Sequence, residues 1–203
     1  MNIGLGNLSE LKVWLLAEEL RTETAWDAQI SAIGCGVAAA FEAYCGRSFE
    51  YLVGAQEEFG AERTYLRLPR YPVQDISAVE FRENIRAEWE DILTLLNSWN
   101  GNAGIVVFTG APGSYEGTVR VTWTGGYWYD TSEDGSGVKP AGARALPADL
   151  KLAWLQHCRA TWAQYPKLGT PVNTVSQAAA LATMPFSPEV TAVLQSYRRL
   201  TLS

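Results

Sequence analysis

Residues 42–50 read EAYCGRSFE, and at this stretch the chain changes from a helical pattern to a β-strand pattern. Gly46 follows the helical pattern directly, at the place where helices commonly end with a left-handed glycine. Cys45 then lies at the helix C-terminus, whose partial negative charge disfavours a thiolate, whereas reactive cysteines favour helix N-termini. The stretch therefore predicts a helix end with a structural cysteine. A small enzyme with Cys45 as nucleophile is the alternative, which rapid alkylation at neutral pH would support.

Two helical patterns precede this point. Ser9 is a suitable N-cap for a first helix over residues 10–20. A longer helix is predicted over residues 25–44, because apolar side chains recur there in steps of three and four. These side chains are Trp26, Ile30, Ile33, Val37, Phe41 and Tyr44. Gly34 and Gly36 each cost the helix about 1 kcal/mol relative to Ala, and such glycines persist more readily where another backbone packs closely.

The chain after residue 48 has β-strand patterns. Strands are predicted over residues 64–68, 73–81, 92–99 and 105–108, and Asn100-Gly101 predicts a hairpin between the last two. Residues 118–124 alternate most clearly, with Val119, Val121 and Trp123 on one face.

Helical patterns return after a polar loop over residues 130–144, which is longer than most connections. A late helix is predicted from Pro147, with a buried face that ends before Pro166. That face consists of Leu150, Trp154, Cys158, Thr161, Trp162 and Tyr165. Residues 167–185 have little periodicity and predict an extended arm or linker. A short terminal helix follows, with Ser187 as N-cap, Pro188 at its first position and Glu189 in its first turn.

These patterns predict an α+β fold. Two N-terminal helices and the late helix form a small helical bundle, with an inserted antiparallel β domain and an extended C-terminal arm. The predicted boundaries are residues 8–48 for the N-terminal helices, 49–129 for the β-rich insertion, 130–146 for a flexible loop, 147–166 for the late helix, and 167–203 for the arm with its short terminal helix.

The composition restricts the classes of function. Of 203 residues, 47% are hydrophobic and 19% charged, which are values of a globular protein. The net charge of -6 disfavours a broad phosphate-binding surface. Three cysteines without a CxxC spacing disfavour a disulfide framework and a zinc site. The first residues lack a signal-peptide pattern, and no window reaches the length of apolar sequence that a membrane span needs. We therefore expect a soluble protein made in a cytoplasm.

Candidate catalytic and metal-binding residues do not form a consistent site. His157 is the only histidine, and its neighbour Cys158 does not face it on a helix, so a structural histidine is favoured over a Cys/His pair. Residues 130–137 could hold a weakly bound calcium ion, but they lack the EF-hand pattern, so a solvated loop is favoured. No catalytic, metal-binding or cofactor-binding residue is therefore assigned.

The aromatic residues around 123–129 allow a second function. Trp123, Tyr127 and Trp128 could form a platform for a sugar, which would make the chain a carbohydrate-binding module. Core packing combined with a subunit interface is favoured, because aromatic residues are enriched in protein interfaces. Glycan binding that quenches tryptophan fluorescence would support the carbohydrate alternative.

Five short stretches together carry a family resemblance. They are residues 11–15 (LKVWL), 43–49 (AYCGRSF), 66–73 (LRLPRYPV), 124–127 (TGGY) and 146–153 (LPADLKLA). In this order and spacing, the chain resembles the head–tail connector (adaptor) proteins of tailed bacteriophages over residues 8–165. Residues 188–199 are also similar to a terminal segment found in such proteins.

The resemblance implies a structural virion protein, not an enzyme, with no cofactor. Identical subunits would form a dodecameric ring beneath the portal protein, at the head–tail junction of the virion. The ring would extend the DNA channel, through which DNA passes without specific binding, and would receive a neck or tail completion protein. Assembly would take place in the host cytoplasm, with no membrane partner. The long sheet, about residues 49–124, departs from the family pattern, so its role stays open.

Two interfaces are expected from the resemblance. The arm over residues 167–203 is the candidate for contact with the portal, with Tyr197 as anchor and with Arg198 and Arg199 pairing with acidic residues. We expect deletion of the residues after Pro185 to leave the fold intact and to abolish attachment to filled heads. The candidates for a second interface are Tyr127, Trp128, Asp130, Glu133 and Asp134.

Overall fold

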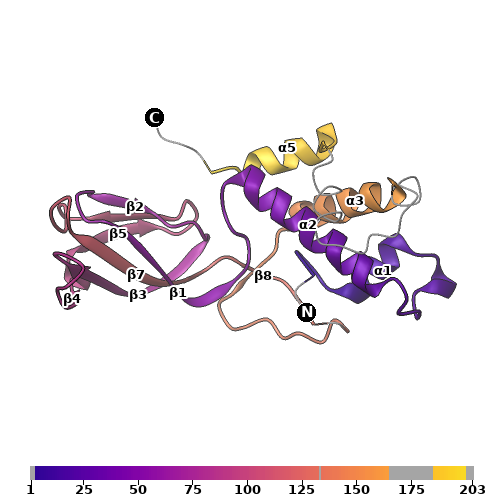
Figure 1. The fold of residues 1–203 in the computed structure, drawn as a ribbon, viewed down its shortest axis with the longest axis horizontal. Coiled ribbons are helices and arrows are strands. Elements are labelled where there is room, and N and C mark those ends of the chain that lie inside the picture. The colour runs from indigo at the N-terminus through magenta and orange to yellow at the C-terminus, as the bar shows by residue number, and fades with distance from the viewer. Residues whose placement is uncertain (1–2, 133, 165–184, 200–203) are drawn as a thin grey trace. The chain divides into compact units, whose positions relative to one another are not determined.

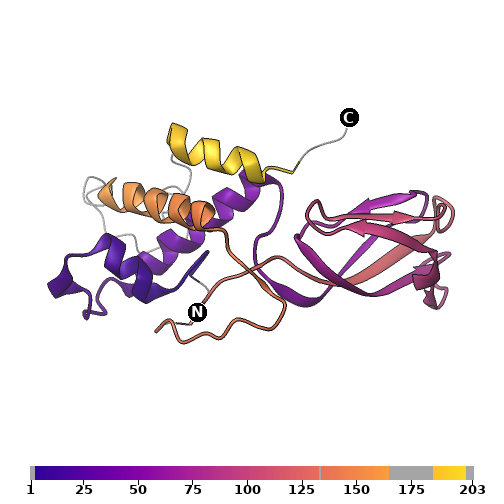
Figure 2. The same ribbon diagram turned by 180° about the vertical axis from the view of Figure 1, so that it is seen from behind.

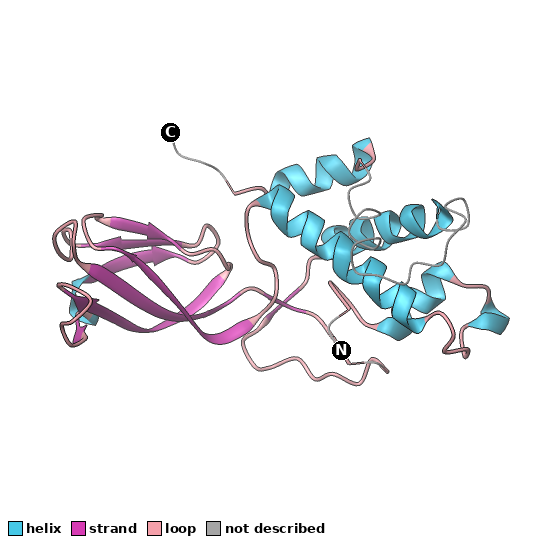
Figure 3. Cartoon of the chain, in the orientation of Figure 1, coloured by secondary structure: helices cyan, strands magenta, loops and turns pink. Residues whose placement is uncertain are grey.

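The structure, a computed structural model, describes residues 3–132, 134–164 and 185–199, which form two compact units (Figure 1). The helical unit takes its described residues from Met1–Arg47, Tyr129–Pro140 and Ala145–Ser203. The β unit consists of Ser48–Trp128 and Ala141–Arg144. The predicted α+β class is confirmed, with helices in one unit and antiparallel sheets in the other (Figure 3).

The helical unit contains α1 (Leu8–Leu15), the 3₁₀ helix η1 (Glu18–Leu20), α2 (Asp27–Cys45), α3 (Ala148–Gln164) and α5 (Pro188–Tyr197). Residues Tyr165 and Pro166, where the late helix was expected to end, lie outside the described residues.

The first helix is shorter than predicted, and its N-cap is Asn7 instead of Ser9. The Asn7 side-chain oxygen accepts a hydrogen bond from the Glu10 backbone N–H at 2.8 Å, which satisfies one donor of the first turn. The helix ends where Leu16 adopts an extended conformation and becomes buried, instead of continuing to Leu20. Leu11 of this helix is fully buried, whereas Trp14 is 37% exposed.

The core of the helical unit lies mainly between α2 and α3. Its buried side chains include Ile30, Ile33, Val37 and Phe41 from α2, and Leu150, Trp154 and Cys158 from α3. The Trp154 indole N–H donates to the Gly34 carbonyl at 3.1 Å. A β-carbon on Gly34 would clash with the Ile3 carbonyl oxygen. Another backbone therefore approaches Gly34 closely, which accounts for a glycine inside this helix.

The C-terminal helix α5 belongs to this bundle, which corrects the expected three-helix arrangement. Ser187 caps it as predicted, since its hydroxyl accepts from the Val190 N–H at 3.3 Å. Val190 and Leu194 are buried, and the helix contacts both α2 and α3. Within the described residues the bundle thus has four α-helices. The expected extended arm, up to residue 184, lies outside those residues.

Helix α2 is long and apolar enough, by length and composition alone, to cross a membrane, contrary to the expectation that no window would be. The buried core helix of a soluble protein passes the same test. Eight residues of α2 are buried in the helical unit, and this packing accounts for its apolar composition.

The β unit contains two sheets of antiparallel strands, which form two layers (Figure 1 and Figure 2). The first sheet has the order β1 (Leu52–Gly60), β7 (Thr118–Gly125), β3 (Val73–Arg82) and β4 (Glu90–Asp91). The second has the order β2 (Tyr65–Arg67), β6 (Ile105–Phe108) and β5 (Leu96–Asn100), with η2 (Leu93–Leu95) before β5. The short strands β8 (Tyr127–Trp128) and β9 (Arg144–Ala145) form a two-stranded pair.

Both sheets of the β unit contribute to one hydrophobic core. Leu66, Val106 and Phe108 from the second sheet pack in the same cluster as Val79 and Val121 from the first. The burial of β7 alternates along its length, as predicted for residues 118–124.

Strands β5 and β1 differ most from the prediction, and the two-residue strands β4, β8 and β9 were not predicted. The hairpin at Asn100-Gly101 is confirmed, but β5 begins only at Leu96, because η2 occupies the preceding residues. Strand β1 was not predicted at all. It lies at the edge of its sheet, with an irregularity between Leu52 and Ala55, so its sequence does not alternate between polar and apolar residues.

Candidate interaction surfaces

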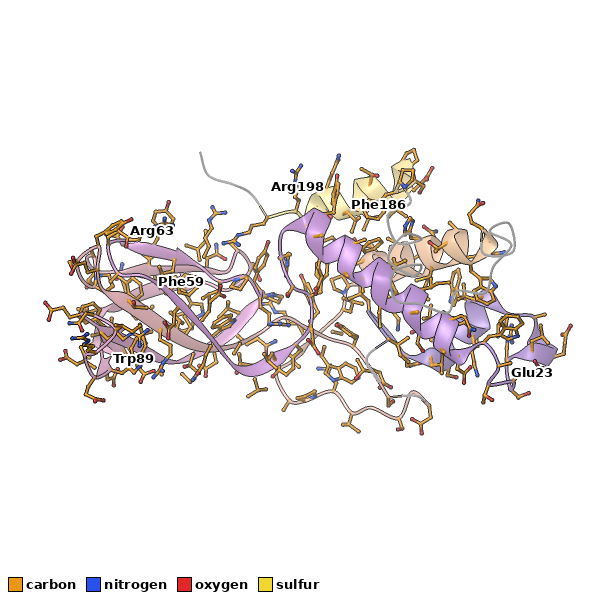
Figure 4. All side chains as sticks on the ribbon, in the orientation of Figure 1. Glu23, Phe59, Arg63, Trp89, Phe186 and Arg198 are labelled. Atoms are coloured by element: carbon orange, nitrogen blue, oxygen red, sulfur yellow. The ribbon has the colours of Figure 1, made fainter. Side chains whose placement is uncertain are left out.

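The three residues expected to contact the portal lie together at the end of α5. The Tyr197 hydroxyl donates to an Asp149 carboxylate oxygen at 2.7 Å. The Arg198 guanidinium lies over the Tyr44 ring, 5.7 Å from its centroid (Figure 4). The Arg199 backbone N–H donates to the Cys45 carbonyl at 2.7 Å, so it occupies an acceptor at the C-terminus of α2. Tyr197 and Arg199 therefore help to hold α5 on its own unit, while the Arg198 side chain is exposed.

This arrangement corrects the expected effect of a C-terminal deletion. Removing the residues after Pro185 would take away Val190 and Leu194, which are buried against α2 and α3. The deletion would expose the apolar surface that these side chains cover, so it would destabilise the helical unit. Loss of attachment in such a variant would not separate a missing contact from a damaged fold.

Phe186, directly before α5, joins an aromatic cluster that the sequence reasoning missed. Its ring makes edge contacts with Phe41, Tyr44 and His157, at centroid distances of 5.3, 5.5 and 5.0 Å. The contacts connect the start of α5 to α2 and α3. An apolar residue directly before a predicted N-cap was the one sequence signal for this role.

His157 is buried in this cluster and is a structural residue, as expected. Burial lowers the pKa of its imidazole from the usual value, because the charged form loses hydration. Its ring Nε2 is buried and has no hydrogen-bond partner among the residues that the structure describes. The apolar packing therefore favours the neutral form of His157.

The cysteines of the helical unit are unsuited to nucleophilic catalysis. Cys45 is fully buried, and its thiol donates to the Leu194 carbonyl at 3.5 Å. Burial raises the pKa of Cys45 to about 11, against the opposing effect of the Arg47 and Arg198 charges. Burial also raises the pKa of Cys158 and of Cys35. The structural role expected for Cys45 agrees with this geometry, and burial is the largest cause of its raised pKa.

The structure does not bring the second set of candidate residues together in one unit. Tyr127 and Trp128 belong to the β unit, whereas Asp130 and Asp134 belong to the helical unit, and Glu133 lies outside the described residues. The Tyr127 backbone donates to the Phe49 carbonyl at 2.7 Å and accepts from the Tyr51 N–H at 2.9 Å. Tyr127 is thus tied into the β unit through its main chain.

Asp130 and Asp134 accept hydrogen bonds from their own loop. Asp130 accepts from the Ser132 hydroxyl at 2.6 Å and from the Gly137 N–H at 3.0 Å. Asp134 accepts from the Ser136 hydroxyl at 2.6 Å. The serine hydrogen bonds lower the pKa of both carboxyls. No group of three potential metal-ligating side chains occurs in the described part of the chain, so the calcium alternative gains no support.

The proposed aromatic platform for a sugar is not formed. Trp123 is only 2% exposed, and its indole N–H donates to the Arg70 carbonyl at 3.2 Å. A buried ring offers no face for a sugar to stack on. Tyr127 and Trp128 are half-buried. The carbohydrate alternative is therefore disfavoured.

Known proteins similar to this chain are found among solved structures. No protein-family model matches the chain, and no curated protein matches it. A chain of the "Virion of native gene transfer agent (GTA) particle" is 20% identical, with a TM-score of 0.54, and the match covers 97% of this chain and 90% of that chain.

Two matches come from neck structures with the same coverage. One, from the "Neck of empty GTA particle computed with C6 symmetry", is 19% identical with a TM-score of 0.54. The other, from the "Neck of native GTA particle computed with C12 symmetry", is 18% identical with a TM-score of 0.53. At these identities the comparison establishes the fold: the chain shares it with proteins of gene transfer agent particles.

Proposed function

We propose that the chain is a structural protein of the neck of a phage-like particle, where its copies form a ring. The observation that carries this proposal is the shared fold, which extends over 97% of this chain and includes a match from a neck computed with C12 symmetry. The family resemblance in the five short sequence stretches supports the same role independently.

In this role the ring is a connector at the head–tail junction of the virion. We infer that twelve copies, by analogy with the C12 neck, lie beneath the portal protein and extend the DNA channel. The ring receives a neck or tail completion protein on its other side. The net charge of -6 is compatible with DNA that passes through the lumen without specific binding. Assembly takes place in the host cytoplasm.

A structural role is favoured over an enzymatic one by the state of the reactive side chains. The thiols of Cys45 and Cys158 are buried with raised pKa values, and His157 is enclosed by aromatic rings. None of these groups is accessible to a substrate in its reactive form. Trp123 is equally enclosed, which argues against a carbohydrate-binding module.

The proposed contact with the portal is made by the end of α5. Tyr197 and Arg199 hold the helix in place, and the exposed Arg198 guanidinium is the group available for an acidic residue of the portal. The proposed second interface consists of Tyr127, Trp128, Asp130, Glu133 and Asp134.

The proposal is tested by mixing the purified chain with purified portal rings and imaging the complexes by negative-stain electron microscopy. We expect an added annulus on one end of the portal ring. The variant Arg198→Glu should form fewer such complexes, and Arg159→Glu, an equally charged change at an exposed position of α3, should not. A portal ring without an annulus, together with absence of the chain from purified particles, would refute the proposed function.

A further inference from the structure

Three connections of the β unit leave the same end of its larger sheet. The register pairs Gly60 of β1 and Arg82 of β3 with Thr118 of β7, so β1 and β3 end where β7 begins. We call the connections at this end, residues 61–64, 83–89 and 110–117, the strand-end surface. Figure 4 shows Arg63 and Trp89 at this end of the unit.

Tyr115 lies at the tip of a turn that is fixed to the sheet by backbone hydrogen bonds. The Gly113 N–H donates to the Ala61 carbonyl, and the Ala61 N–H donates to the Gly117 carbonyl, both at 3.1 Å. Gly113 and Gly117 lie against the Phe81 ring so closely that a β-carbon on either glycine would clash with it. The turn is therefore held at both of its ends, yet the Tyr115 side chain is 86% exposed.

Ile85 occupies a similar position on the neighbouring connection. The Asn84 carbonyl accepts from the Ala87 N–H at 3.0 Å, and the Asn84 side chain accepts from the Arg86 N–H at 3.0 Å. These bonds close a turn around Ile85, whose side chain is 83% exposed. A second bulky apolar residue is thus presented to solvent on an ordered turn.

The end of this connection is anchored by Trp89. The guanidinium groups of Arg82 and Arg120 lie 4.3 and 4.2 Å from the centroid of the Trp89 ring. Each arginine is in turn paired with a glutamate, Arg82 with Glu58 at 2.8 Å and Arg120 with Glu80 at 2.7 Å. The stack fixes the end of residues 83–89 to β3 and β7. Ile85 and Tyr115 are thus each presented on a turn that is bonded to the sheet.

The charged residues around these two side chains are mainly acidic. The strand-end surface contains the acidic residues Glu62, Glu83, Glu88 and Glu116 and the basic residues Arg63 and Arg86. Arg63 is paired with Glu62. Both residues of β4, Glu90 and Asp91, are also exposed beside the surface. An acidic border of this kind attracts a basic protein surface and repels nucleic acid.

We propose that the strand-end surface is a docking site for a different protein of the particle, with Tyr115 and Ile85 as anchors. The partner surface that fits it has an apolar pocket bordered by lysine or arginine side chains. Tyrosine is frequent among the residues that dominate binding energy. Turns that are already ordered before binding lose little conformational entropy when the partner binds. The same surface of a second copy carries the same acidic border, so two copies would not pair through it. This inference rests on the proposed function, since it places the partner in the neck or tail.

The test is photo-cross-linking in assembled particles. The photoreactive residue p-benzoylphenylalanine replaces Tyr115 in one variant, Ile85 in a second, and Val13 in a control. Val13 belongs to the helical unit, is 51% exposed and lies outside both proposed interfaces. After illumination of purified particles, we expect cross-links from positions 115 and 85 to one other polypeptide, in a segment that contains lysine or arginine. Position 13 should not cross-link to that segment.

A charge-reversed background tests the acidic border. With Glu83→Lys, Glu88→Lys and Glu116→Lys added, the cross-link yield from position 115 should fall about tenfold, because like charges then face each other. An unchanged thermal unfolding curve shows that this variant folds. An unchanged yield would overturn the proposed chemistry of the partner.

The outcomes separate this inference from the proposed function. If the chain is present in the particles but positions 115 and 85 yield no cross-link, the inference fails and the proposed function stands. Cross-links only to other copies of this chain would also overturn the inference. Absence of the chain from particles would overturn both.

Discussion

The helical unit and the β unit differ in how far apart in the sequence the segments lie that form their cores. The helical core is completed by segments far apart in the sequence, since Gly34 and Trp154 are 120 positions apart and Cys45 and Leu194 are 149 apart. The β unit consists almost entirely of one continuous segment, Ser48–Trp128. The helical unit therefore depends on long-range closure, whereas the β unit depends mainly on pairing within one stretch of chain.

The two units also differ in where they place polar side chains. Among the described residues, all the buried polar or charged residues belong to the helical unit: Lys12, Ser31, Arg47, His157 and Thr161. In the β unit the charged pairs, such as Arg120 with Glu80, lie outside the hydrophobic core. We expect substitutions and pH changes to affect the two units separately, and four predictions test this.

The largest effect is expected from Trp154→Ala. Trp154 is fully buried and donates a hydrogen bond to Gly34, so the variant should lose about 3–5 kcal/mol of the free energy of unfolding of the helical unit. Hydrogen exchange measured by mass spectrometry in urea can follow each unit separately. Trp123→Ala should lower the free energy of unfolding of the β unit and leave that of the helical unit unchanged. Equal losses in both units from either variant would show that the units unfold together.

Leu194→Ala tests whether α5 completes the helical unit. The Leu194 side chain is fully buried. Its removal should lower the free energy of unfolding of the helical unit by about 2–4 kcal/mol in the same measurement. Gln195→Ala, at an exposed position of the same helix, is the matched control and should change the stability little. If Leu194→Ala leaves the exchange of α2 and α3 unchanged, α5 contributes no stability to the bundle.

Low pH should destabilise the helical unit alone. Burial lowers the pKa of His157 from 6.5, so below that pH the unfolded state binds the proton more readily than the folded state. Neutral His157 makes its full contribution to the free energy of unfolding above pH 6.5. This contribution is lost as the pH falls below 6.5, by at most about 1.4 kcal/mol per pH unit. The pKa values of Asp130 and Asp134 are lowered from 3.8, so protonation of these carboxyls affects stability only in a separate, more acidic pH range.

The variant His157→Gln provides the control for this pH dependence. Denaturant unfolding between pH 5 and 7.5 should give a flatter pH dependence in the variant than in the unmodified chain. A β unit that loses stability over the same range would contradict the separation of the two units.

The smallest effect is expected from Arg120→Gln in the β unit. The substitution removes one of two cations from the Trp89 ring and the ion pair with Glu80. Since these groups are partly exposed, we expect a loss of about 1 kcal/mol or less. Exchange in residues 83–89 should increase while the rest of the sheet stays protected. A large loss of stability across the β unit would show that the stack supports the core.

Much of the fold could be predicted because local patterns agree with it. The apolar stripe of α2, the cap of α5 and the alternation of β7 each depend on neighbouring residues, and the structure confirms all three. Strand β1 could not be predicted, because Leu52 and Val53 are exposed and the charged Glu57 takes a partly buried position where alternation would place an apolar residue. The docking of α5 on α2 and α3 was also missed, since an apolar helix face does not specify its partner.

The candidate surfaces were harder to predict than the fold. Arg198 is exposed as a contact residue requires, but Tyr197 and Arg199 are bonded within their own unit. The sequence did not predict Tyr115 and Ile85 as surface contacts, because the presence of a bulky residue in a turn does not indicate whether its side chain is exposed. Their exposure depends on the backbone hydrogen bonds of the turns, which only the structure shows.

The contact of Leu194 with Cys45 has a consequence for synthesis on the ribosome. The two residues are separated by 149 positions, so at about 5–20 residues per second α2 waits roughly 7–30 s for the helix that covers it. The whole continuous segment of the β unit emerges within that interval and can fold first. The nascent chain therefore carries an uncovered apolar face on α2 beside a finished β unit, and chaperone binding during translation should concentrate on α2.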